Sequence, residues 1–275
     1  MKLLLPLQRA LLAFAVFAAF SNAQAETKLN ILLVNGGCCH DYDEQGLVIK
    51  NLIESSLKAE VTIAHGSTKK PNATFAEYES DDWAEFYDLI IHNECSARVS
   101  DLEYIERVLN AHLKGVPAIN IHCAMHSYRR GDFKNPVELG ADNAKWFEMI
   151  GLQSSGHGPR APVDVTYENV EHPVITGLED WTTPVGELYN NIQIFDTATV
   201  LAKGAQTIRD KRTPELAIVW TNEYGPDKTR IISLSIGHTS EEMLDENFEK
   251  LLIRSALWAT DNINADGSAK NGLAM

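Results

Sequence analysis

Three histidines, His40, His122 and His238, each follow an apolar segment of the sequence where that segment ends. Imidazole can act as an acid, a base or a metal ligand near neutral pH. If the apolar segments are parallel strands of one sheet, their carboxyl ends lie at one edge, where open α/β sheets bind their ligands. The sequence therefore predicts a shared polar pocket at that edge.

A metal site is a second possibility, because His122 and His126 are four residues apart. If a helix begins at His122, both side chains project from one face, as two metal ligands would. The HExxH pattern of metalloproteases is absent, so a third ligand is needed, and the candidates are His40, His157 and Glu187. We predict His40, His122 and His126 as the ligands of a divalent ion such as zinc.

The remaining site residues are predicted from the same strand ends. Glu187 could orient a histidine or accept a proton, and with His122 and His238 it completes the predicted catalytic set. The predicted substrate-binding residues are Gly36, Gly37, His40, Asp41, Glu94 and Tyr189. The two glycines would let backbone amides approach a ligand closely. No GxSxG, P-loop or GxGxxG motif occurs, which weakens serine-hydrolase, nucleotide-hydrolase and dinucleotide-enzyme interpretations.

The elements that must position these residues alternate between strands and helices. Short apolar runs predict strands at residues 30–34, 61–64, 87–92, 116–121, 163–167 and 199–202, and an antiparallel hairpin at 216–221 and 230–236. Helical spacing of apolar residues predicts helices at 47–57, 102–113, 142–150 and from Thr239 onward. We expect Ser100 with Glu103, and Thr239 with Glu242, to begin helices as capping boxes. The predicted fold is a three-layer α/β sandwich, a mostly parallel sheet with an antiparallel edge.

Composition and charge narrow the possible partners. The chain has 275 residues and a net charge of −14, with 44% hydrophobic residues, as in a folded globular protein rather than a disordered chain. Such an acidic chain lacks the basic face that nucleic-acid binding requires. Nothing in the sequence sets the oligomeric state.

The first 25 residues have the pattern of a secretory signal peptide. Basic residues precede an apolar run of residues 10–20, and the Ala23-Gln24-Ala25 pattern predicts cleavage after Ala25. We expect a periplasmic or secreted protein with no stable membrane insertion after cleavage. One domain should span residues 26–262, followed by a flexible polar tail at 263–275.

The four cysteines, Cys38, Cys39, Cys95 and Cys123, match no zinc-finger spacing. Adjacent Cys38 and Cys39 cannot easily bond to each other without strain. We expect the cysteines to be small buried hydrophobic residues. Bridges from Cys38 to Cys95 or from Cys39 to Cys123 remain open alternatives.

Several segments together resemble one family. GGCCHDY after the first predicted strand, INIHCA at the fourth, GHG, ELY and the closing GHTSEEMLDENFEKLLIRSALWA are similar to the ThuA-like family, named from trehalose utilisation, over about residues 28–261. The resemblance implies a flavodoxin-type fold like that of class I glutamine amidotransferases. It also implies a role in sugar catabolism, often beside enzymes that oxidise sugars to 3-keto derivatives.

The comparison with the amidotransferases bears on His122. In that superfamily a cysteine occupies the sharp turn after the comparable strand, and His122 is similar in position, with Cys123 one residue later. His238 with Glu241 resembles the later His-x-Glu pair, with one extra residue between. The chain therefore departs from the thiol triad.

The predicted function is that of a carbohydrate enzyme, a hydrolase or lyase acting on a glycoside or 3-keto-sugar, with a small-molecule carbohydrate as its partner. Two alternatives remain open. One is a thiol-dependent hydrolase that uses Cys123 and His238, and the other is a non-catalytic periplasmic sugar-binding module.

Overall fold

The computed structural model describes residues 28–270 and 272–275, so the predicted signal peptide and its cleavage site lie outside the described residues. Among the described helices, none is long and apolar enough to cross a membrane.

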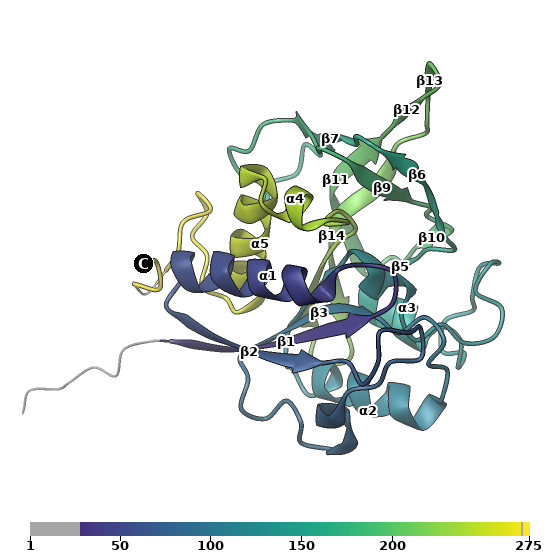
Figure 1. The fold of residues 1–275 in the computed structure, drawn as a ribbon. Coiled ribbons are helices and arrows are strands. Elements are labelled where there is room, and N and C mark those ends of the chain that lie inside the picture. Colours follow the sequence, from purple (N-terminus) through teal and green to yellow (C-terminus); the bar gives the residue numbers. More distant parts are fainter. Residues whose placement is uncertain (1–27, 271) are drawn as a thin grey trace, which may run out of the picture.

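A nine-stranded mixed sheet forms the centre of the molecule, in the order β2-β1-β3-β4-β15-β14-β11-β7-β8 (Figure 1). Its parallel half consists of β2 (Ala59–His65), β1 (Leu29–Gly37), β3 (Leu89–Cys95), β4 (Ala118–Ile121) and β15 (Thr229–Leu234). Its antiparallel half consists of β14 (Leu216–Tyr224), β11 (Ala198–Ala205), β7 (Asp164–Tyr167) and β8 (Trp181–Thr182). The central strands are continuous apolar runs because helices cover both faces of this part of the sheet.

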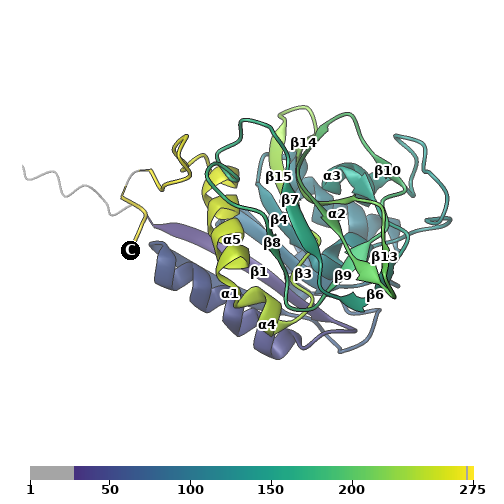
Figure 2. The ribbon, with the colours of Figure 1, turned by 90° about the horizontal axis from the view of Figure 1, so that it is seen from above.

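The helices form two layers (Figure 2). One layer contains α1 (Tyr42–Ser56), α4 (Ser240–Met243) and α5 (Glu246–Ala259), and the other contains α2 (Leu102–Leu113), α3 (Lys145–Ile150) and the 3₁₀ helix η1 (Ala76–Glu79). A further 3₁₀ helix, η2 (His122–His126), directly follows β4. Three small two-stranded sheets pair β5 (Leu152–Gln153) with β10 (Gln193–Ile194), β6 (His157–Ala161) with β9 (Gly186–Tyr189), and β12 (Thr207–Ile208) with β13 (Lys211–Arg212).

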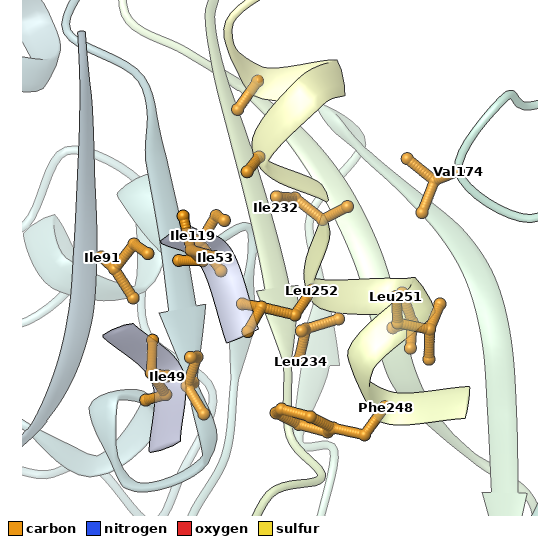
Figure 3. Close-up of a cluster of buried hydrophobic side chains, with 14 of the residues drawn as sticks. Ile49, Ile53, Ile91, Ile119, Val174, Ile232, Leu234, Phe248, Leu251 and Leu252 are labelled. Atoms are coloured by element: carbon orange, nitrogen blue, oxygen red, sulfur yellow. The ribbon is translucent and has the colours of Figure 1, made fainter. Parts of the chain in front are cut away.

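The core divides along the sheet because successive side chains of a strand point to opposite faces. In β1, Ile31 and Leu33 face α1 and α5, whereas Leu32 and Val34 face α2 and α3. On the first face, side chains from α1 and α5 meet those of the central strands, among them Ile49, Ile53, Phe248, Leu251, Ile119 and Ile232 (Figure 3). Burial of each such side chain contributes about 1.5–3 kcal/mol before entropy is counted.

The predicted fold class is confirmed, a three-layer α/β sandwich whose core strands are mostly parallel. The predicted hairpin is also present, since β14 and β15 pair antiparallel around the turn at Gly225. These two strands join the antiparallel half of the sheet to the parallel half, because β15 also pairs parallel with β4.

One predicted helix start is wrong, and a second begins where expected but ends early. Asp101 rather than Ser100 caps α2, because its carboxylate accepts a hydrogen bond from the Tyr104 amide at 2.9 Å. The last helix is split: Thr239 caps only the four residues of α4, and Asp245 begins α5 by accepting from the Asn247 amide. Leu244 between them is 61% exposed, so it is not part of the apolar face that we expected.

The C-terminal tail, expected to be flexible, packs against α1 where it is described. Leu273 is fully buried, and its carbonyl accepts a hydrogen bond from the Lys58 amide. The Met275 amide donates to the carbonyl of Ser56, the last residue of α1. The tail therefore satisfies a helix-terminal carbonyl that would otherwise bond to water.

The cysteines also differ from the expectation of unpaired, buried side chains. The structure pairs Cys38 with Cys39 and Cys95 with Cys123, and no described cysteine is free. The second pair forms because β3 and β4 are neighbours and both cysteines lie at their carboxyl ends, with Cα atoms 5.1 Å apart. Neither of the two bridges considered from the sequence is the one formed.

Candidate functional site

Histidines from three strand ends meet at the carboxyl edge of the parallel sheet. His40 follows β1, His122 follows β4, and His238 follows β15. The ring centroids lie 4.9 Å apart for His40 and His122, 4.8 Å for His40 and His238, and 5.1 Å for His122 and His238. The parallel strands thus bring together three imidazoles that are far apart in the sequence, and we call them the histidine cluster.

His122 lies at a sharp turn between β4 and η2. Its φ of 44° is unusual for a residue with a side chain and is found where tertiary contacts hold the backbone, often at functional sites. Its Nδ1 lies 2.7 Å from the carbonyl oxygen of Ser235, and a carbonyl can only accept. Nδ1 therefore carries the proton, and Nε2 presents its lone pair to the cluster when the ring is neutral.

Glu187 faces the cluster from β9, which lies outside the main sheet. Its Oε2 lies 3.6 Å from His122 Nε2, 3.5 Å from His238 Nδ1 and 3.4 Å from His157 Nδ1. Arg160, on the paired strand β6, places Nε 3.7 Å from the other carboxylate oxygen. The β6–β9 hairpin therefore places one acidic and one basic group beside the histidine cluster.

The charges of the cluster follow from burial. Burial, followed by repulsion from the neighbouring imidazoles, lowers the pKa of His40 to about 3 and that of His238 to about 4. For Glu187, burial opposes ionisation, but the interaction with His122 and the other nearby histidines outweighs it and lowers the pKa to about 2. At neutral pH the pocket therefore holds a carboxylate beside at least two neutral imidazoles.

His126, one of the predicted metal ligands, is not part of the histidine cluster. In a 3₁₀ helix such as η2 there are three residues per turn, so side chains four residues apart point about 120° away from each other. His126 Nε2 instead lies 2.9 Å from Ser154 Oγ, and its ring stacks on that of Tyr189 at 4.3 Å. Tyr189 is fully buried and forms a wall of the site, 4.7 Å from the His122 ring.

The structure places the other predicted substrate-binding residues at different distances from the pocket. Asp41 caps α1 through the Glu44 amide and lines the cavity beside His40. Gly36 and Gly37 lie at the end of β1, against the backbone of Gly66 and Cys95 respectively. These close approaches explain why both positions require glycine.

Glu94 lies apart from the histidine cluster. It is fully buried, with Oε1 2.9 Å from His92 Nδ1 and 3.0 Å from the hydroxyl of Tyr128. Residues 90, 92 and 94 of β3 share the sheet face that α2 and α3 cover, because the side-chain period of a strand is two. Glu94 does lie at the carboxyl end of β3, as predicted, but the sequence did not show to which face of the sheet its side chain points.

A cavity of about 380 Å³ opens beside the histidine cluster. It is lined by Cys39, His40, Asp41, Glu44, Gln45, Arg160, His238, Thr239 and Ser240. The sequence did not indicate Arg160 or Gln45, because both lie inside regular elements with no motif around them. The side-chain amide of Gln45 donates a hydrogen bond to the His238 carbonyl. A larger hollow of about 1420 Å³ lies over α2 and the β14–β15 turn, but no histidine is among its described lining residues. We therefore assign the site to the smaller cavity.

The disulfides remove the basis for a thiol nucleophile. Cys123, required by the thiol-hydrolase alternative, is bonded to Cys95 and is buried. A disulfide sulfur cannot supply the thiolate that nucleophilic catalysis needs. The imidazoles and Glu187 are the titratable groups that contact one another at this edge of the sheet.

The fold and site together define an α/β-sandwich protein with a histidine and glutamate pocket at the carboxyl edge of its sheet. The ThuA family model, described as trehalose utilisation, matches residues 30–259, so the chain belongs to the ThuA family. No curated protein matches the chain.

Solved structures share the fold at low sequence identity. A ThuA-like protein from Parabacteroides merdae aligns with a TM-score of 0.65 and 18% identity, over 90% of this chain and 93% of that one. A ThuA-like protein from Bacteroides uniformis aligns with a TM-score of 0.58 and 17% identity, over 85% and 91%. Part of a GH42 β-galactosidase from G. stearothermophilus aligns with a TM-score of 0.50 and 14% identity, over 84% of this chain and 30% of that one. At these identities the matches establish the fold alone.

Proposed function

We propose that this chain is an exported enzyme of carbohydrate catabolism that acts on a glycoside or 3-keto-glycoside in the pocket beside the histidine cluster. The observation that carries the proposal is the placement of Glu187, whose Oε2 lies 3.4–3.6 Å from nitrogens of three imidazoles. A carboxylate beside imidazoles provides a base and an acid within reach of one substrate.

The geometry suits elimination from a 3-keto-glycoside. The C3 carbonyl makes the hydrogen on C2 acidic, so Glu187 can remove that proton as general base. The electron pair then forms a C1–C2 double bond and expels the glycosidic oxygen, which takes a proton from the imidazolium form of His122. Addition of water across the double bond would complete net hydrolysis. Glu187 and His122, two of the three predicted catalytic residues, thus have a defined role in one reaction.

Further support comes from the family and the cavity. The family is described by trehalose utilisation, which points to sugars as the substrate class. The cavity of about 380 Å³ lies within the usual range for small-molecule sites, roughly 300–1,000 Å³, and Asp41, Gln45 and Arg160 offer partners for hydroxyl groups. Two disulfides and the signal-like residues 1–25 support export to an oxidising compartment.

Turnover of a chromogenic 3-keto-glucoside by the mature chain tests the proposal. Replacing Glu187→Gln keeps the shape of the side chain but removes the base, and kcat should fall by roughly 10²–10⁴-fold. The control Glu223→Gln changes a surface carboxylate far from the pocket and should leave kcat unchanged. The melting temperature of both variants should remain close to that of the wild type.

Three results would separate the interpretations. Full activity of E187Q would exclude Glu187 as the base. Sugar binding with no product over long incubation would favour the sugar-binding module. Loss of activity on alkylation of Cys123 would restore the thiol-hydrolase alternative, which the Cys95–Cys123 pair argues against.

A further inference from the structure

The histidine cluster has the composition and geometry of a metal site. One nitrogen from each of His40, His122 and His238 lies within 4.8 Å of the other two. Three histidines with an open fourth position are a common ligand set for catalytic zinc. All three follow parallel strands of one sheet, β1, β4 and β15, of which β4 and β15 are neighbours. Short connections to these strands hold the histidines in place more firmly than a long loop would.

The surroundings of His122 are those of a metal ligand. Histidines that bind metals usually donate their other ring N–H to a carbonyl or carboxylate, which fixes the tautomer and aims the free nitrogen. His122 Nδ1 makes this contact with the Ser235 carbonyl at 2.7 Å. Its Nε2 therefore faces the cluster with a lone pair available.

His238 is only partly satisfied by hydrogen bonds. Its Nδ1 lies 3.2 Å from His122 Nε2. Only one of these two nitrogens can carry a proton in this contact, and it then donates a hydrogen bond to the lone pair of the other. Its Nε2 is buried and has no hydrogen-bond partner among the residues that the structure describes. An unpaired buried nitrogen is unfavourable, and a cation at the cluster would draw on these nitrogen lone pairs.

The charge balance of the pocket also suits a dication. Glu187 supplies a negative charge 3.5–3.6 Å from two of the imidazoles. The other group of possible ligands, Cys38, Cys39 and Cys95, is held in disulfides and offers no thiolate. The imidazoles are therefore the candidate ligands, and imidazole favours zinc, copper, iron or nickel over magnesium or calcium.

We propose that His40, His122 and His238 bind one divalent transition-metal ion, zinc before others, with an open coordination position toward the cavity. The inference rests on the proposed function in that the ion would occupy the same pocket. With the ion bound, His122 Nε2 would be a ligand and could not also donate the proton to the leaving group, so the two roles of this nitrogen exclude each other. Binding can nevertheless be measured with no substrate present. The ligand set differs from the one predicted from sequence, because His238 takes the place of His126.

The experiment uses the untagged mature chain after dialysis against a chelator. Titration with Zn²⁺ by calorimetry should show one ion per chain, and Co²⁺ should give the visible absorption bands of a low-symmetry site. Added Zn²⁺ should raise the melting temperature, because an ion that binds only the folded state stabilises it. Absence of saturable binding of both ions would overturn the proposal.

Variants locate the ion. His40→Ala should weaken Zn²⁺ binding at least 100-fold, and this half-buried loop position can be changed with little effect on folding. His238→Ala should have the same effect. The matched control His65→Ala removes an exposed imidazole at the end of β2, at the same edge of the sheet, and should bind Zn²⁺ as the wild type does. Unchanged binding in both H40A and H238A would refute the assignment.

The outcomes for metal and function are distinguishable. Stoichiometric Zn²⁺ binding that H40A abolishes, with no turnover of the 3-keto-glucoside, would support the metal site and contradict the proposed substrate. Full turnover by the chelated protein, with no Zn²⁺ binding, would support the function and contradict the metal site.

Discussion

Gly37 lies at the end of β1, directly before the segment that carries His40. Its φ of 101° falls in the region that favours glycine, and a Cβ at this position would collide with the carbonyl of Cys95 on the neighbouring strand. The backbone of β1 can therefore turn toward the pocket only because this residue has no side chain.

Gly37→Ala should destabilise the protein by roughly 3 kcal/mol or more, because left-handed strain adds to a backbone collision. The matched control is Gly115→Ala, where φ is 96° but nothing lies within 4 Å of the added Cβ. That variant should lose only about 1–2 kcal/mol from strain. Denaturant unfolding measures both, and equal losses would show that the contact with Cys95 is unimportant.

His122 shows what a residue and its neighbours could indicate in advance. Because His122 directly follows an apolar run, the sequence predicted that it lies at the carboxyl edge of the sheet. The tautomer of His122 depends on the carbonyl of Ser235, which lies more than a hundred residues later in the sequence. This carbonyl comes close to His122 only because β15 pairs with β4. The position of His122 at this edge could thus be predicted from the sequence, whereas the ring nitrogen that faces the histidine cluster could not.

At the scale of elements, helix starts were the least predictable feature. Ser100 and Asp101 are both good capping residues, and Glu103 made Ser100 the better match to a capping box. The structure uses Asp101 because its carboxylate reaches the Tyr104 amide. Two adjacent residues of similar capping strength cannot be separated by local sequence alone.

Asp101→Ala should cost about 1 kcal/mol of unfolding free energy, the usual value for loss of an N-cap. Ser100→Ala, one residue away and also exposed, should change stability by less than about 0.5 kcal/mol. Chemical denaturation of the two variants side by side checks the assignment. The reverse order of losses would restore the capping box at Ser100.

The short helix after β4 had a larger effect on the predicted site. The four-residue spacing of His122 and His126 implied a shared face only if the segment were α-helical. As a 3₁₀ helix, η2 directs His126 to Ser154 and Tyr189 instead. The choice between the two helix types came from packing around a five-residue segment, which local propensity does not determine.

At the scale of the whole molecule, the disulfides tie the carboxyl ends of the strands together. Cys95 and Cys123 join the ends of β3 and β4 and close a chain loop with a sequence separation of 28. Cys38 and Cys39 are neighbours in sequence and close no loop of this kind. Stabilisation by a cross-link through the unfolded state grows with the length of the loop.

The double variant Cys95→Ala with Cys123→Ala should therefore lose roughly 3–4 kcal/mol of unfolding free energy under oxidising conditions. The double variant Cys38→Ala with Cys39→Ala should lose much less. Guanidinium unfolding of both, with mass spectrometry after alkylation to confirm the pairing, tests this. Comparable losses would indicate that the cysteines pair differently.

The sequence by itself determined the layers of the fold, the family and the edge of the sheet where the three histidines meet, because these depend on apolar periodicity and on residues at strand ends. Only the tertiary structure decided that His126 lies outside the cluster of His40, His122 and His238, that Glu94 faces the core, and that Arg160 reaches Glu187. These features depend on contacts between segments far apart in the chain and on the direction of each side chain, and both are fixed only when the strands pair and the helices pack.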